Sequence, residues 1–132
     1  MSQENITLTK SLYEAFGRGD MPTFLAAMDP KIEWLEPGGP GYPYPGVHRG
    51  VQAVGGEVFA QVPVYYEEFS VTPHDFVDAG DRVLVLGDFY GKSKATGKTF
   101  NVPFIHAFTF HDGKCTRYQN YTDTGTVAAA LQ

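Results

Sequence analysis

Apolar and polar residues in the first half of the chain alternate at helical spacing, interrupted by one short strand. Apolar side chains on one face predict an amphipathic helix over residues 4–16, which Gly17 and Gly19 end. Asp20 is placed to cap a second helix, which Asp29-Pro30 is expected to stop. Residues 31–36, KIEWLE, alternate as a strand does.

A loop and a third helix are predicted to follow this strand. Residues 37–46, PGGPGYPYPG, hold too many prolines and glycines for a helix or a central strand, so they predict a loop. Its prolines favour a stiff rim for any pocket over a moving lid. Valines at positions 51, 54, 58 and 62 recur at helical spacing and predict a helix over residues 50–62, which Pro63 closes.

The second half of the chain changes to a period of two. Four β-rich runs, EEFSVTPHDFVD, DRVLVLGDFYG, KTFNVPFIHAFTF and KCTRYQNYT, are separated by glycine-containing turns and predict an antiparallel meander. Asp123 or Thr124 then caps a short terminal helix. Helices followed by strands predict an α+β fold of one domain, residues 1–132, with the helices on one face of a curved sheet.

Composition narrows the classes of partner. The net charge is −5 and no segment gathers lysine and arginine, so a nucleic-acid partner is not expected. We find no signal peptide and no apolar run of membrane-spanning length, and the single cysteine, Cys115, excludes an internal disulfide, so a cytoplasmic location is expected. The four histidines are scattered and no cofactor motif is present, so neither a metal nor a cofactor is predicted.

Alternation in PFIHAFTF brings a histidine among aromatic rings. Phe104, His106 and Phe108 share one face, typical of a core or a pocket. There His106 is kept largely neutral by desolvation and is a candidate proton carrier or hydrogen-bond donor. The alternative is a structural histidine in a filled core, and the two interpretations have equal weight on the residues alone.

The last strand turns an amide, and not a carboxylate, towards the same face as Tyr118. Tyr118 and Asn120 share one face, while Asp123 has the opposite parity and precedes the terminal helix, so it is predicted to be a helix cap. Asn120 either polarises a ligand carbonyl or is a strand amide bonded to a neighbour. Asp88 is the other strand carboxylate, although a nearby turn favours its solvation.

Several stretches together resemble one family. LYEAFGRGDM, IEW, GDRVLVLG, KATGKTF, HAFTFHDGK and YQNYTDT occur in the order found in the SnoaL-like polyketide cyclase and ketosteroid isomerase-like families of the nuclear-transport-factor-like superfamily. The resemblance implies a cone, in which a curved mixed or antiparallel sheet wraps around three N-terminal helices. It also implies an apolar pocket at the wide end and a homodimer formed through the sheet.

The same resemblance suggests roles for individual residues. Cyclases of this family place an acid/base aspartate where this chain has Asn120, and ketosteroid isomerases use a first-helix tyrosine, here Tyr13, as a donor to the substrate oxyanion. The alternative for Tyr13, core packing beside Phe16, is favoured on the residues alone, because aromatic residues on helices usually fill a core. The residues expected to line the pocket are Phe16, Trp34, Phe104, Phe108 and Tyr118.

These observations predict a pocket for an apolar, oxygenated molecule such as a polyketide-like or steroid-like ketone. If the protein is an enzyme, the expected chemistry is cofactor-free proton transfer, with His106 as proton carrier and Asn120 with Tyr13 or Tyr118 stabilising enolate charge. The alternative is a binding or dimerisation module without catalysis, favoured by the absence of a carboxylate at position 120.

Overall fold

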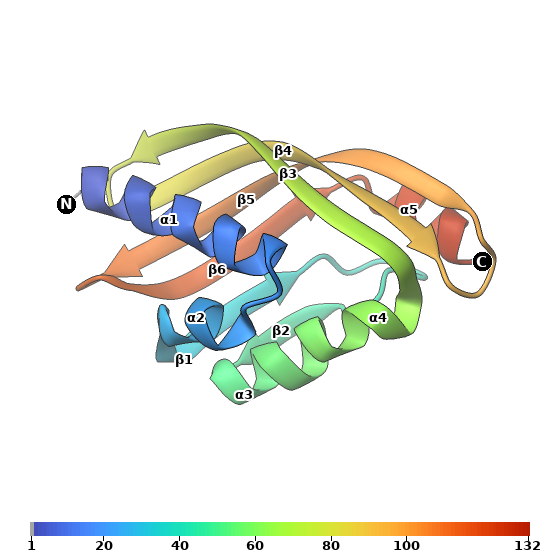
Figure 1. The fold of residues 1–132 in the computed structure, drawn as a ribbon, viewed down its shortest axis with the longest axis horizontal. Helices are drawn as coiled ribbons and strands as arrows, with labels where there is room; N and C mark the ends of the chain where they lie inside the picture. Colours follow the sequence, from blue (N-terminus) through green and yellow to red (C-terminus); the bar gives the residue numbers. More distant parts are fainter. Residues whose placement is uncertain (1) are drawn as a thin grey trace.

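A six-stranded mixed sheet forms the main layer of the computed structural model, which describes residues 2–132 (Figure 1). The strands are β1 (Met28–Glu36), β2 (Gly46–Arg49), β3 (Tyr66–Ala79), β4 (Arg82–Ser93), β5 (Thr99–His111) and β6 (Lys114–Thr122). Their order in the sheet is β2-β1-β6-β5-β4-β3. The predicted meander of β3 to β6 is confirmed, and β1 adds to it in parallel with β6.

Helices cover the inner face of this curved sheet. They are α1 (Ser2–Gly17), α2 (Met21–Ala26), α3 (Val51–Ala53), α4 (Val62–Tyr65) and α5 (Thr124–Leu131). In Figure 1, α1 crosses the sheet, and the short helices α2, α3 and α4 lie beneath it. The predicted α+β fold, with a curved sheet around N-terminal helices, is therefore confirmed.

Two helix caps follow the sequence prediction. The Asp20 carboxylate accepts a hydrogen bond from the backbone N–H of Thr23 at the start of α2. The Asp123 carboxylate accepts one from the backbone N–H of Thr126 at the start of α5. Asp123 is therefore a cap, as its parity predicts.

The ends of two predicted helices were wrong, and one strand was missed. The second helix ends at Ala26, and Asp29-Pro30 belongs to β1, where the register with β6 shifts and proline displaces no ladder bond. Strand β2 was missed because only four residues form it, directly after the loop. Pro63 does not end the third helical segment, because proline is tolerated in the first turn of α4.

The third helical segment is not one regular helix. A π-helical turn over Val54–Val58 and a 3₁₀ turn over Phe59–Gln61 separate α3 from α4. Gly55 and Gly56 occupy the π-helical turn, and glycine stabilises regular helix poorly. The π-helical turn still buries Val54 and Val58, two of the four valines whose spacing predicted a helix.

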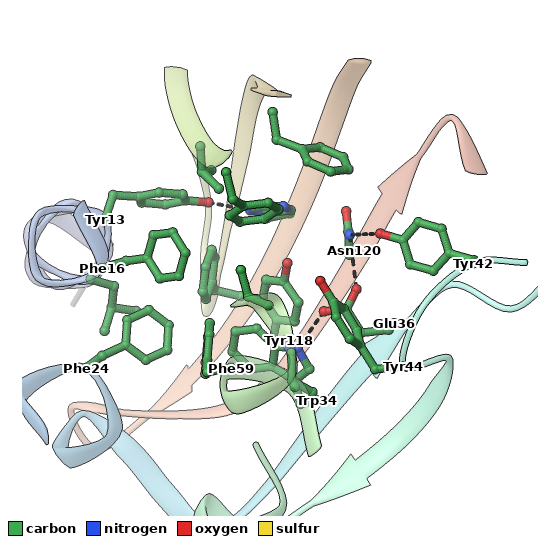
Figure 2. Close-up of a pocket in the computed structure, with 18 residues that line it drawn as sticks. Tyr13, Phe16, Phe24, Trp34, Glu36, Tyr42, Tyr44, Phe59, Tyr118 and Asn120 are labelled. Atoms are coloured by element: carbon green, nitrogen blue, oxygen red, sulfur yellow. Dashed lines mark hydrogen bonds between the residues drawn. The ribbon is translucent and has the colours of Figure 1, made fainter. Parts of the chain in front are cut away.

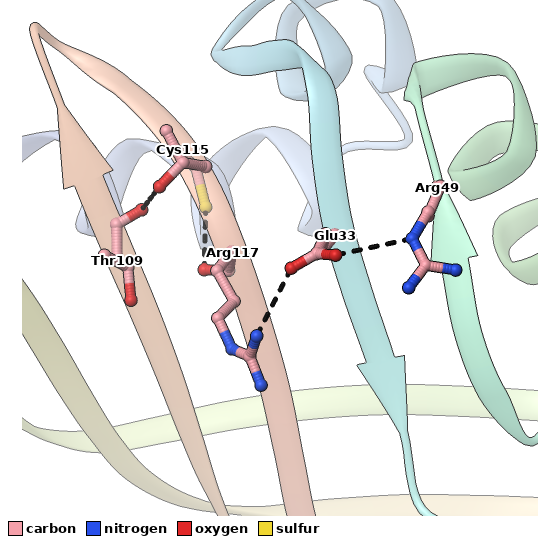
Figure 3. Close-up of polar contacts among 6 residues, drawn as sticks. Glu33, Arg49, Thr109, Cys115 and Arg117 are labelled. Carbon is pink, nitrogen blue, oxygen red and sulfur yellow. Dashed lines mark hydrogen bonds and ion pairs between the residues drawn. The ribbon is translucent and has the colours of Figure 1, made fainter.

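The outer face of the sheet is arranged in rows that run across the strands. Figure 3 shows Glu33 between two arginines, at 3.3 Å from Arg49 and 3.3 Å from Arg117. The next row is mainly apolar, and its members pair in register: Val47, Leu35, Gln119, Ala107, Leu84 and Val77. Beyond it, Tyr121 pairs with Ile105, and Ile105 with Leu86.

Candidate functional site

A cavity of about 80 Å³ lies between the inner face of the sheet and the helices. Its walls are mostly aromatic and aliphatic, with a few polar groups (Figure 2). The residues that line it are Leu12, Tyr13, Phe16, Phe24, Trp34, Glu36, Tyr42, Tyr44, Val58, Phe59, Val62, Phe69, Val71, Phe89, His106, Phe108, Tyr118 and Asn120. A few polar groups in an apolar cavity are typical of a small-molecule site.

Three of the polar residues come from three adjacent strands. Glu36 is on β1, Asn120 on β6 and His106 on β5, and His106 pairs with Asn120 in register. The Asn120 side chain donates to Glu36, with 3.2 Å between Nδ2 and Oε1. The cavity wall therefore carries a continuous polar row of carboxyl, amide and imidazole.

Glu36 is a buried carboxyl with two hydrogen-bond donors. Trp34 Nε1 donates to Oε2 over 2.7 Å, and Asn120 Nδ2 donates to Oε1. Burial raises the pKa of Glu36 to about 7, and the two donated bonds only partly oppose that rise. A carboxyl with this pKa is ready to take up and release a proton near neutral pH.

Sequence reasoning missed Glu36, although its signal was present. The alternation in KIEWLE that turns Ile32 and Trp34 inward continues to Glu36, so all three share the buried face. Glu36 lies at the end of the strand, before Pro37, where a glutamate is ordinarily solvated. In the structure, Tyr42 and Tyr44 of the following loop line the cavity together with Glu36, and the carboxyl is buried.

Tyr13 and His106 form a second polar centre. Tyr13 Oη lies 2.7 Å from His106 Nδ1. Burial raises the pKa of Tyr13 well above its usual value and lowers the pKa of His106 to about 3, so both are neutral near pH 7. If Tyr13 donates, the proton of His106 is on Nε2; if Nδ1 donates, the Tyr13 hydroxyl proton is free. Either tautomer leaves the pair one donor for a ligand.

The loop after β1 closes the Glu36 end of the cavity. It contributes Tyr42, whose hydroxyl accepts a bond of 3.3 Å from Asn120 Nδ2, and Tyr44. Burial raises the pKa of both tyrosines, and the nearby Glu36 charge raises it further. His48 holds this loop, since its Nε2 donates to the Tyr44 carbonyl over 2.9 Å. The predicted rim therefore forms part of the pocket wall.

The structure brings most of the predicted site residues together. His106, Asn120, Tyr13, Phe16, Trp34, Phe108 and Tyr118 all line the cavity. Phe104 does not line it; its ring stacks on His106, with 3.7 Å between the centroids. Asp88 faces away, partly exposed and 2.9 Å from His74 Nε2, so it supplies no acid to the cavity.

The described residues form neither a metal-binding cluster nor a membrane-spanning helix. Within residues 2–132, no group of three or more histidine, cysteine, aspartate or glutamate side chains is placed to hold a metal ion. Among the helices of the same range, none is both long and apolar enough to cross a membrane.

Comparison with known proteins supports the family resemblance. The sequence profile of the SnoaL-like domain matches residues 9–118. Comparison with curated proteins gives no significant match.

Solved structures share this fold over almost the whole chain. An NTF2-like protein from Burkholderia xenovorans LB400 is 36% identical, with a TM-score of 0.86, over 100% of this chain and 98% of that one. TerC, co-crystallised with polyporic acid, is 31% identical, with a TM-score of 0.87, over 97% and 98% of the two chains. An NTF2-like protein from Burkholderia thailandensis E264 is 29% identical, with a TM-score of 0.90, over 96% of each.

Proposed function

Because the chain belongs to the SnoaL-like domain family, we propose that it binds a small apolar ketone and catalyses proton transfer next to the carbonyl group. The observation that carries this proposal is the buried Glu36 carboxyl, which lies in the same cavity as the Tyr13–His106 pair. A base near neutral pKa and a donor for an oxyanion are the two groups that enolisation needs.

The chemistry divides between the two polar centres. Glu36 takes a proton from the carbon next to the carbonyl, and the C–H electron pair moves into a C=C bond while the carbonyl oxygen becomes an enolate. The free donor of the Tyr13–His106 pair stabilises that oxygen. Glu36 then returns the proton to the same or a conjugated carbon, so no external oxidant or cofactor is needed.

This assignment gives His106 a different role from the one expected from sequence. With a pKa of about 3, His106 binds a proton too weakly to carry one near neutral pH. Glu36 is the better proton carrier, since its pKa is about 7. The carboxylate that position 120 lacks is thus available from β1, and Asn120 donates a hydrogen bond to it.

The cavity volume limits the ligand. An engineered cavity of about 150 Å³ takes up benzene, so a cavity of about 80 Å³ must widen somewhat even for a ligand of one ring. A polyketide-like or steroid-like ketone needs a larger movement, and the loop of residues 37–45, which contributes Tyr42 and Tyr44 to the wall, is the segment we expect to move. Polyporic acid, with which TerC was co-crystallised, is a suitable probe for such movement.

Glu36→Gln tests the proposal directly. We expect the protein to accelerate deuterium exchange next to the carbonyl of one-ring cyclic ketones such as cyclohexanone, measured by NMR. Removing the base should lower this rate by about 10²–10⁴-fold. The wild-type rate should rise with pH up to about 7 and then level off, because the base must be ionised.

Glu33→Gln is the matched control. Glu33 is on the same strand but faces outward to Arg49 and Arg117, so its substitution should leave the exchange rate unchanged. Equal rates in Glu36→Gln and the wild type would contradict the proposal. Ketone binding without exchange in the wild type would favour a binding module.

A further inference from the structure

Half of the Asn120 amide has no partner. Its Nδ2 donates to Glu36 Oε1 and to Tyr42 Oη. Its Oδ1 is fully buried, and no donor within residues 2–132 reaches it. The side chain is only 8% exposed, and Figure 2 shows its oxygen pointing away from Glu36 and Tyr42.

A purely structural amide would not be expected to leave this atom unpaired. A buried acceptor without a donor costs about 1–3 kcal/mol, and most buried polar groups in proteins are paired. Rotating the amide would not remove the cost while Glu36 is ionised, because Oδ1 would then face a carboxylate oxygen. While Glu36 is ionised, its charge therefore fixes which way the amide points.

The position of Asn120 indicates which part of a bound ligand would lie next to its side-chain oxygen. Asn120 lies between Glu36 and His106 in the polar row, and neighbouring strands are about 4.8 Å apart. A ketone with its oxygen at the Tyr13–His106 pair and its acidic carbon at Glu36 spans Asn120. A substituent on or beside that carbon then faces the amide.

We propose that Asn120 Oδ1 accepts a hydrogen bond from a hydroxyl group of the ligand, so that the substrate is a hydroxyketone. The hydroxyl is on the carbon next to the carbonyl or on the following one, within reach of the polar row. This inference rests on the proposed function for the orientation of the ketone, but its test measures binding alone. An ether oxygen at the same place would be rejected, because it has no proton to donate.

Three one-ring probes separate the possibilities: phenol, catechol and 2-methoxyphenol. Each phenol oxygen resembles that of an enolate and is expected to accept from the Tyr13–His106 pair. The second hydroxyl of catechol is then free for Asn120 Oδ1. We expect the wild type to bind catechol about tenfold more tightly than the other two probes in calorimetric or NMR titrations.

Asn120→Leu removes the acceptor with little change in volume and should reduce this preference to less than twofold. Gln119→Leu, on the adjacent position of β6 with the opposite parity, should keep it. The preference is the ratio of the dissociation constants of two probes for the same variant, so a general loss of affinity does not change it. If Asn120→Leu fails to fold, the preference for catechol over 2-methoxyphenol in the wild type decides alone.

Equal binding of the three probes to the wild type would overturn the inference, as would a preference that persists in Asn120→Leu. Failure of all three probes to bind at millimolar concentration would also overturn it. These results are distinct from failure of the proposed function. Equal binding of the three probes to the wild type would count against the role of Asn120, whereas an unchanged exchange rate in Glu36→Gln would count against Glu36 as the base.

Discussion

Two buried ionisable residues give the cavity its chemical character. Glu36 and His106 are both transferred out of water, and in both cases burial disfavours the charged form. The pKa of Glu36 is therefore raised to about 7, and that of His106 is lowered to about 3. These opposite shifts make the free energy of unfolding depend on pH in opposite directions.

For Glu36, the folded protein binds the proton more tightly than the unfolded chain does. Its contribution to stability is complete below pH 4.5, its ordinary pKa, and is lost as the pH rises to about 7. The size of the change is about 3 kcal/mol. For His106, the unfolded chain binds the proton more tightly, so stability is present above pH 6.5 and is lost as the pH falls towards 3.

Single substitutions should separate the two effects. Relative to the wild type, Glu36→Gln should become more stable as the pH rises from 4.5 to 7, and His106→Gln should become more stable as it falls below 6.5. Denaturant unfolding at a series of pH values measures both. Glu33→Gln is the control. If the free energy of unfolding varied with pH in the same way in Glu36→Gln and in the wild type, the assigned burial of Glu36 would be refuted.

At the scale of elements, the loop between β1 and β2 completes the cavity. It is held at two places. Gly41 has φ +81°, and an added Cβ would lie 2.5 Å from Gln132 Nε2 and 3.1 Å from Ala128 Cβ, so glycine allows the loop to pack on α5. Tyr44 has φ +39°, which is unusual for a residue other than glycine, and its carbonyl accepts from His48.

His48 therefore positions the loop from β2. It is buried, and its Nδ1 lies 2.7 Å from Glu57 Oε1 while its Nε2 holds the Tyr44 carbonyl. We expect His48→Ala to increase amide hydrogen exchange in residues 38–46 by about tenfold, because the strained Tyr44 loses its partner. Mass spectrometry of exchanged peptides measures this.

His74→Ala is the matched control for that experiment. His74 also pairs with a carboxylate, Asp88, but it lies on the outer part of β3 and is exposed. Its substitution should leave exchange in the loop unchanged. Unaltered exchange in His48→Ala would show that α5 and the prolines alone fix the loop.

At the scale of the whole molecule, the outer face of the sheet is the unexplained surface. Val77, Leu86, Ile105 and Tyr121 are 42%, 37%, 41% and 50% exposed on neighbouring strands. We propose that a second copy of the chain covers this face, as the family resemblance implies. A two-fold axis would bring the same apolar rows together, and the Arg49–Glu33–Arg117 row at their border would remain hydrated.

Ile105→Asp should disrupt this homodimer. Placing a charge in the centre of an apolar interface removes favourable burial and leaves a carboxylate without a partner, so the variant should be monomeric at micromolar concentration. Light scattering coupled to gel filtration measures the mass. Val64→Asp, on α4 and 59% exposed, is the control. A monomeric wild type would exclude the proposed dimer.

Local sequence determined most of the fold. Periodicity identified the first helix and the two aspartate caps, because each depends on neighbours within a few residues. It also identified the β3–β6 meander, because alternation marks each strand and short turns join consecutive strands. Alternation also turned His106, Tyr118 and Asn120 towards the inside. It could not define β2, which has only four residues and is a strand because it pairs with β1. It also could not define the π-helical and 3₁₀ turns that break the third helical segment around Gly55 and Gly56.

The tertiary structure decided the chemistry of the cavity. Glu36 and Asn120 are 84 residues apart in sequence, and Tyr13 and His106 are 93 apart, so no local pattern links them. Parallel pairing of β1 with β6 and the fold of the loop over Glu36 bring these groups together and exclude water from them. The sequence by itself determined which side chains face inward. Only the tertiary contacts decided which of them lost their solvation, and hence which carboxyl has a pKa near neutrality.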